Sequence, residues 1–244
     1  MADTELWLAD LDKAAAALDA VQAKTPRLPD EFLQRLNGMA HEALRRERRL
    51  AHIALRILLE ARLGPGIRRA PFVRGAAGKP ALAGGGAAFS LAHTRGLALI
   101  AIGDRDPLGA DIERMRPMRI PEVRRVSIER EAAALAAGAP LAGPGRDARF
   151  LSAWVRIEAA AKAHGSGVGP ILERLRPGRE QAHGVLEPRA HEPARIVVYD
   201  VPVSEGVFAA AALAAGSQPP ALRELPDTIT AIEALLGAAE GTRD

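Results

Sequence analysis

The segment from residue 89 to residue 103, FSLAHTRGLALIAIG, restricts the fold more than any other part of the chain. Short apolar runs flank Arg95-Gly96, and this pattern predicts a β-hairpin that turns there. The sequence LGADIE follows within a few residues and places Asp111 and Glu113 two apart at the end of a predicted strand. Side chains at i and i+2 of a strand share one face, and neighbouring carboxylates repel unless a positive group lies between them. The two acids therefore either face water at a strand end or hold a cation.

The part of the chain before the hairpin contains one predicted strand and one long predicted helix. Residues 5–10, ELWLAD, are typical of a short strand. Apolar residues at helical spacing predict a helix from Asp30 to Leu63. The helix is expected to end at Gly-Pro-Gly, residues 64–66, because these residues do not continue a helix.

The part after LGADIE follows a similar order. Residues 119–138 predict a helix with Ser127 as its N-cap. Residues 147–165 predict a second helix, for which Gly165 is the expected C-cap. Two strands are expected between residues 194 and 216, with a turn at Ser-Glu-Gly, residues 204–206.

Both parts therefore offer a helix, a glycine-rich loop and a hairpin, which indicates an internal repeat of about 100 residues. We expect an α+β fold of two similar α/β subdomains, residues 1–107 and 108–215, each a small antiparallel sheet packed on a long helix. A C-terminal tail is expected from residue 216 to residue 244. It contains one short amphipathic segment, DTITAIEALLG, that either packs on the body or remains apart from it.

The composition is that of a soluble globular protein, with 48% apolar and 26% charged residues. No apolar run reaches the length of about 18 residues that a membrane span needs, and the first residues are acidic where a secretory signal would be basic. The chain has no cysteine, so no disulfide framework is possible and a cytoplasmic location is the default expectation.

Positive charge in this chain comes almost entirely from arginine, and the sequence pI is about 9.8. Such a pI raises the alternative of a nucleic-acid-binding protein. Only 3% of the residues are aromatic, however, and the basic residues are scattered, which disfavours stacking on bases or a basic stripe. Among the 33 basic residues there are four lysines: Lys13, Lys24, Lys79 and Lys162.

One face of the predicted helix at residues 147–165 carries an unusual set of side chains. Trp154, Glu158 and Lys162 are four residues apart and therefore share that face. Taken alone, Glu158 and Lys162 are most simply a solvated ion pair. In the same way, Lys79 in AGKPAL is compatible with an ordinary turn, and His93 in SLAHT with a structural histidine.

Together, the segments AGKPAL, FSLAHT, LGADIE and WVRIEAAAKAHG occur in an informative order. Their succession resembles the 4′-phosphopantetheinyl transferases, specifically the long, pseudo-dimeric class. The resemblance covers residues 45 to 170, or about 5 to 212 when the layout of strands and helices is included. It implies two subdomains related by pseudo-twofold symmetry and a monomer. It also implies transfer of the phosphopantetheine arm of coenzyme A to a serine of an apo acyl or peptidyl carrier protein, with release of 3′,5′-ADP.

The resemblance also implies roles for individual residues. The family uses Mg²⁺, and the implied ligands are Asp111, Glu113 and Glu158. Implied contacts to the coenzyme A phosphates come from Lys79, His93 and Lys162, and candidates for the 3′-phosphate are Arg45 and Arg74. Glu158 matches the family position that takes the proton of the attacking serine, and Lys162 would neutralise charge on the phosphate, as phosphoryl transfer requires. His93 completes the implied catalytic set.

The chain departs from the family pattern near these residues. Ile157 replaces a lysine beside the helix glutamate, which leads us to expect slower transfer or altered handling of the carrier. Ala92 and Thr94 replace the usual serines around His93. Two further alternatives are a degenerate relative that binds coenzyme A without transferring it and a metal-dependent phosphohydrolase or nuclease. No nucleic acid or membrane partner is expected.

Overall fold

The hairpin expected at residues 89–103 forms the middle of a sheet. The structure is a computed structural model, and it describes residues 4–75, 78–174 and 196–238, so that residues 239–244 of the expected tail lie outside it. Strands β4 (Ala88–Thr94) and β5 (Leu97–Gly103) pair antiparallel, which confirms the predicted hairpin. Its turn residues Arg95 and Gly96 both have positive φ, 38° and 82°, which is the backbone conformation of tight hairpin turns.

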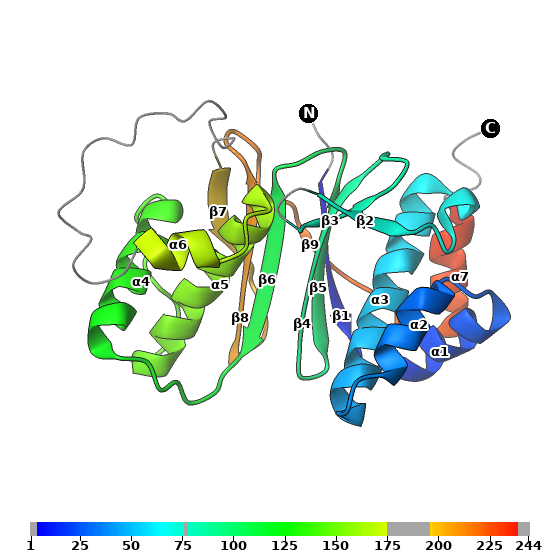
Figure 1. Ribbon diagram of the computed structural model, residues 1–244, viewed down its shortest axis with the longest axis horizontal. Coiled ribbons are helices and arrows are strands. Elements are labelled where there is room, and N and C mark those ends of the chain that lie inside the picture. Colours follow the sequence, from blue (N-terminus) through cyan, green and yellow to red (C-terminus); the bar gives the residue numbers. More distant parts are fainter. Residues whose placement is uncertain (1–3, 76–77, 175–195, 239–244) are drawn as a thin grey trace.

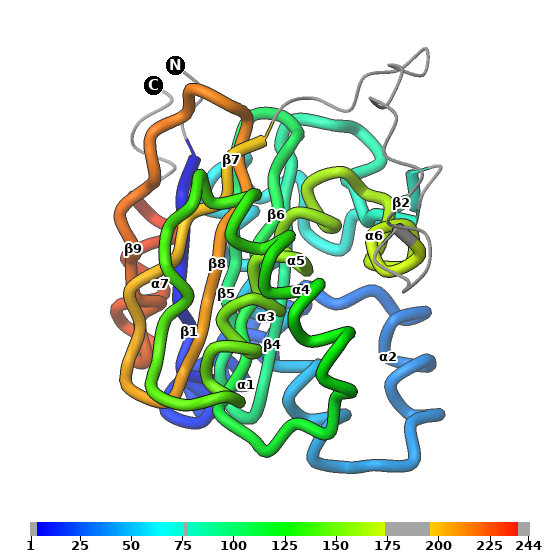
Figure 2. Tube along the Cα trace, turned by 90° about the vertical axis from the view of Figure 1, so that its left-hand side faces the viewer, coloured from blue at the N-terminus to red at the C-terminus, as the bar shows by residue number. Residues whose placement is uncertain are grey.

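Two further strands extend this sheet in the order β4-β5-β1-β9. The strand predicted at residues 5–10 is present as β1 (Glu5–Asp10), and it pairs antiparallel with β5. On its other side it pairs parallel with β9 (Leu222–Glu224), which comes from the expected tail. The tail continues into α7 (Ile229–Ala238), where Ile232 is fully buried against the first part of the chain. Figures 1 and 2 both place β9 and α7 beside elements from the start of the chain.

A second sheet has the order β6-β8-β7 and is antiparallel throughout. Its strands are β6 (Leu108–Arg114), β7 (Ile196–Asp200) and β8 (Val207–Ala214). Helix α5 (Arg146–His164) packs on β6 at very short range, because Gly109 has no side chain. A Cβ atom there would lie 2.0 Å from the carbonyl oxygen of Ala159. The glycine of LGADIE is thus what allows this strand to approach the helix.

The fold is a mixed α+β arrangement in which the two larger of the three sheets in the described residues lie between outer helices (Figure 1). Alternate residues of β5 belong to different hydrophobic clusters: Leu97, Leu99 and Ala101 pack toward the second sheet, and the residues between them pack toward helix α3 (Glu42–Leu63). Because both faces are covered, all of β5 is apolar. A buried hydrogen bond of 3.0 Å from the amide of Ala110 to the hydroxyl of Ser90 joins β6 to β4.

The remaining elements are short or cover the outer faces. Their bounds are α1 (Ala15–Lys24), α2 (Asp30–Asn37), the 3-10 helix η1 (Pro65–Ile67), β2 (Phe72–Arg74), β3 (Pro80–Leu82), α4 (Glu122–Leu135) and α6 (Gly169–Arg174).

Two local expectations from the sequence are wrong. The helix expected from Asp30 to Leu63 is divided into α2 and α3, because Gly38 ends α2 and His41 is extended. Ser127 is not an N-cap: α4 begins earlier, at Glu122 after an extended proline, and the Ser127 hydroxyl donates to the Val123 carbonyl oxygen inside the helix. The other cap is confirmed, since Gly165 ends α5 in the left-handed conformation, with φ of 69°.

Candidate functional site

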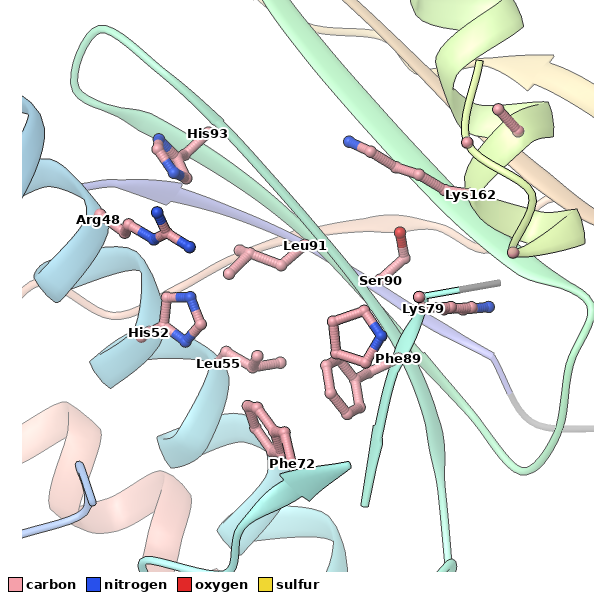
Figure 3. Close-up of a pocket in the computed structure, with 15 residues that line it drawn as sticks. Arg48, His52, Leu55, Phe72, Lys79, Phe89, Ser90, Leu91, His93 and Lys162 are labelled. Atoms are coloured by element: carbon pink, nitrogen blue, oxygen red, sulfur yellow. The ribbon is translucent and has the colours of Figure 1, made fainter. Parts of the chain in front are cut away.

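A pocket of about 360 Å³ lies where the two parts of the chain meet. Its walls come from α3, from the loop before β3 and from β4 on one side, and from the C-terminal end of α5 on the other. Figure 3 shows His93 and Arg48 on one side of this pocket and Lys162 opposite them. Three residues expected at the site, Lys79, His93 and Lys162, therefore line one cavity although 83 residues separate the first from the last (162 − 79).

Lys162 connects this pocket to Asp111. Its Nζ donates to Asp111 Oδ1 at 2.7 Å and to the carbonyl oxygen of Ala110 at 3.2 Å. The pKa of Asp111 is raised to about 7, mainly by burial and also by the charges of Glu158 and Glu113, while Lys162 acts to lower it. Lys162 thus favours the ionised carboxylate and opposes the effect of burial.

Glu113 and Glu158 lie close enough to Asp111 to affect its ionisation, and we call these three residues the acid cluster. Burial raises the pKa of Glu158, and the charge of Glu113 adds to this effect while Lys162 opposes it. Glu113 is paired with Arg116 at 2.8 Å. Acids from strand β6 and helix α5 thus lie near Lys162.

The acid cluster has the donor chemistry that Mg²⁺ prefers, because all three residues offer carboxylate oxygens. The three carboxylates also repel one another, and a divalent cation bound among them would relieve this repulsion. As the side chains stand, however, the described part of the chain contains no group of three or more histidine or acidic residues arranged to hold a metal ion. Positive charge at the cluster comes from Lys162 and Arg116.

His93 makes a contact that the sequence did not indicate. Its Nδ1 lies 2.7 Å from Oε1 of Glu47 on helix α3, and both side chains are largely buried, at 22% and 17% exposure. The second oxygen of Glu47 accepts a hydrogen bond of 3.3 Å from the amide of Gly96. Because 46 residues separate Glu47 from His93 (93 − 47), no local pattern links them.

Lys79 lines the pocket but also has partners of its own. Its Nζ donates to the carbonyl oxygen of Leu108 at 2.7 Å and pairs with Asp106. These contacts tie the loop before β3 to the start of β6. Lys79 therefore supplies positive charge to the pocket wall from a fixed position, with 16% of its side chain exposed.

A second pocket, of about 250 Å³, adjoins the first and shares Arg48, His52 and Phe72 with it. Arg35 and Arg74 also line it, and we call it the arginine pocket. Among the described residues, none of its three arginines forms an ion pair with an acid. The guanidinium of Arg74 donates to the carbonyl oxygen of Gly78, at 2.9 Å.

The arginine pocket has a positive field and an aromatic wall. Burial, together with the charges of Arg48 and other basic neighbours, lowers the pKa of His52 to about 3, so the ring is neutral. His52 lies between the rings of Phe32 and Phe72, with centroid distances of 4.2 Å and 6.5 Å. A ligand that joins an anionic group to a planar ring would bind the guanidinium groups with its anion and pack its ring against the aromatic side chains.

The 3′-phosphate candidates from the sequence are placed differently by the structure. Arg74 lines the arginine pocket, whereas Arg45 lines neither pocket. Arg48, one helical turn after Arg45, lines both, and sequence reasoning missed it. The sequence signal that could have identified Arg48 is its spacing of four residues from His52, which places both side chains on one face of the helix.

The structure shows what surrounds two residues that depart from the family pattern, Ile157 and Thr94. Ile157 is fully buried in a cluster with Ile128 and Phe150, where α5 packs on α4. The side chain is therefore part of the core. The hydroxyl of Thr94 donates to Glu113 at 3.3 Å, so the residue after His93 contacts the acid cluster.

Neither models of known protein families nor curated proteins match this chain. Among the residues that the structure describes, no helix has the length and apolar character needed to cross a membrane.

Proposed function

We propose that this chain is a 4′-phosphopantetheinyl transferase that uses Mg²⁺ to transfer the phosphopantetheine arm of coenzyme A to a serine of an acyl or peptidyl carrier protein. One observation carries the proposal most strongly. Acids from β6 and α5 gather beside Lys162, and the same lysine lines a pocket that continues into three arginines without an acidic partner among the described residues. An acid cluster joined to a basic pocket suits a substrate with several phosphates and a required cation.

The proposed coenzyme occupies both pockets. The arginine pocket would take the 3′-phosphate and the adenine ring, because its guanidinium groups lack acidic partners among the described residues and its wall is aromatic. Lys79 and His93 would contact the pyrophosphate in the larger pocket. The pyrophosphate would then lie between the arginine pocket and the acid cluster.

Bound Mg²⁺ would neutralise the pyrophosphate and make its phosphorus more electrophilic. Asp111, Glu113 and Glu158 are the residues that would hold it. Glu158 would accept the proton of the carrier serine. The serine oxygen forms a bond to the phosphorus of the pantetheine phosphate, and the bond to the 3′,5′-ADP oxygen breaks. Lys162 would donate to a phosphate oxygen as negative charge develops there.

The finer expectations from the family belong to this proposal. They are the pseudo-twofold relation of the two subdomains, the division at residues 107 and 215, a monomeric state and a cytoplasmic location. The pseudo-twofold relation is supported by the two larger sheets, each of which has a long helix packed on its outer face.

Binding of coenzyme A without transfer is a second candidate function. It is favoured by one observation: within the described residues, the acids as placed do not form a group that can hold a metal ion. The two functions differ in whether a covalent product forms.

The decisive experiment combines the protein with coenzyme A, Mg²⁺ and an apo carrier protein, and measures the carrier by intact mass spectrometry. Transfer predicts a mass gain of one phosphopantetheine group and an equal amount of 3′,5′-ADP. The gain should disappear when the metal is chelated. Coenzyme A binding without a mass gain on several acyl and peptidyl carriers would overturn the transferase proposal in favour of the second candidate.

A further inference from the structure

We propose that Glu47 is a positioning residue that fixes the tautomer and orientation of His93 at the pocket, and so strengthens the binding of coenzyme A phosphates. The identity of the ligand rests on the proposed function. The effect on the imidazole does not, and it is measured separately below.

The contact between Glu47 and His93 determines which ring nitrogen carries a proton. A carboxylate can only accept a hydrogen bond, so the ring nitrogen 2.7 Å away, Nδ1, must donate. Nε2 makes no hydrogen bond to any described residue and is the nitrogen left to serve the pocket that His93 lines. A ring that also carried a proton on Nε2 would donate to a phosphate, and the charge of Glu47 would balance the charge of that ring.

Glu47 also restricts how the ring can move. Its second oxygen accepts from the amide of Gly96, so one carboxylate holds both His93 and the turn that follows it. On its other side this turn contacts β6, because the carbonyl oxygen of Arg95 accepts a hydrogen bond of 2.9 Å from Arg114. The end of the hairpin is thus held from α3 and from β6 at once.

Two explanations of the Glu47 contact make different predictions. A positioning residue acts on the ligand through His93, whereas a purely structural residue acts through the turn at Gly96. The variants Glu47→Ala and Glu47→Gln separate these explanations, because a glutamine oxygen can still accept from Nδ1. Glu42→Ala is the matched control, since Glu42 is an exposed acid near the start of the same helix.

The first measurement is the ¹⁵N NMR spectrum of the His93 imidazole without ligand, assigned with a His93→Gln variant. We expect a protonated Nδ1 in the unchanged protein, in Glu47→Gln and in Glu42→Ala. Glu47→Ala should lose this preference and populate both tautomers. An unchanged His93 spectrum in Glu47→Ala would overturn the proposal.

The second measurement is the Kd of coenzyme A by titration calorimetry. Glu47→Ala should weaken binding about tenfold, as expected for loss of a charge-assisted hydrogen bond. Glu47→Gln should lie between Glu47→Ala and the unchanged protein. If Glu47 acts through His93, the double variant Glu47→Ala/His93→Ala should bind no more weakly than His93→Ala alone.

Additive losses in the double variant would overturn the positioning role and assign Glu47 to the turn. If the unchanged protein shows no affinity for coenzyme A, the proposed function fails. The NMR spectra would then still decide whether Glu47 controls the His93 tautomer. Should Glu47→Ala prove unfolded by thermal denaturation, the same two measurements are made on Glu47→Asp, whose shorter side chain withdraws the carboxylate from Nδ1.

Discussion

The acid cluster and the arginine pocket handle their charges in opposite ways. In the acid cluster, two carboxylates already have cationic partners: Asp111 pairs with Lys162 and Glu113 with Arg116. In the arginine pocket, no guanidinium pairs with an acid of the described residues. A ligand at the acid cluster must therefore exchange existing partners, whereas an anion at the arginine pocket gains contacts without breaking an ion pair. We expect changes at the first region to affect folding and turnover, and changes at the second to affect affinity.

The largest effect is expected from Gly109→Ala, which tests how closely β6, the strand that carries Asp111 and Glu113, packs on α5. The added Cβ would lie 2.0 Å from the Ala159 carbonyl oxygen and 2.6 Å from the Ala163 nitrogen, so β6 must move away from α5. We expect a loss of at least about 3 kcal/mol in the free energy of unfolding, as for severe overpacking. Denaturant unfolding measures it.

Gly84→Ala is the matched control for this substitution. A Cβ at Gly84 meets no atom within 4 Å, so its effect should stay within about 0.5 kcal/mol. Equal stability of the two variants would contradict the close contact between β6 and α5.

The second prediction concerns turnover. Asp111→Asn removes a charge from the acid cluster while preserving shape, and we expect kcat for carrier modification to fall about 100-fold or more. The Kd of coenzyme A measured without metal should change less than about threefold, because the proposed contacts to the 3′-phosphate and the adenine ring are in the arginine pocket. If kcat and the affinity for coenzyme A fell by the same factor, the acid cluster would not affect turnover separately from binding, and the contrast with the arginine pocket would be wrong.

The control for Asp111→Asn is Asp227→Asn, which makes the same chemical change at an exposed position. This control should retain full turnover. Normal metal-dependent transfer by Asp111→Asn would show that Asp111 is not a metal ligand.

The third prediction concerns affinity. Arg48→Gln removes a guanidinium that lines both pockets, and the Kd of coenzyme A should rise about tenfold or more, because a charge-assisted contact is lost. The effect should be much smaller for an analogue that lacks the 3′-phosphate. Arg124→Gln, an exposed arginine on α4, is the control and should bind both ligands normally.

If Arg48→Gln weakens both ligands equally, Arg48 does not contact the 3′-phosphate. An unchanged Kd for both would remove the arginine pocket from the proposed site altogether.

The smallest expected effect is the dependence of stability on pH. The pKa of Asp111 is raised from 3.8 to about 7 by burial, so the folded state binds a proton more strongly than the unfolded state. Its contribution to stability is therefore greatest below about pH 4 and is lost as the pH rises to about 7. Asp111→Asn should remove this dependence, so its Tm relative to the unchanged protein should be more favourable at pH 8 than at pH 5. A Tm difference that does not vary with pH would show that Asp111 ionises normally.

Local sequence patterns were sufficient for much of the fold. The hairpin from β4 to β5, the strand β1 and the C-cap at Gly165 follow from turn residues, alternation and glycine conformation, which act over a few residues. The same rules failed where two local signals competed. Ser127 has the side chain of an N-cap, but α4 begins earlier, at Glu122 after Pro121, and the Ser127 hydroxyl donates within the helix.

The candidate site divides in the same way. The spacing in LGADIE placed Asp111 and Glu113 on one face of a strand, and the turn of a helix placed Glu158 beside Lys162. The pair of Glu47 and His93, and the choice of Arg48 over Arg45, were not predictable because they depend on how α3 lies against the hairpin.

The sequence by itself determined which charged side chains share a strand face or a helix face, because those relations follow from the geometry of a single element. Only the tertiary structure decided which charges meet. Asp111 is paired with a lysine 51 residues away, while the arginine pocket has no acidic partner among the described residues. Electrostatic pairing depends on distance and burial between elements, and packing sets both.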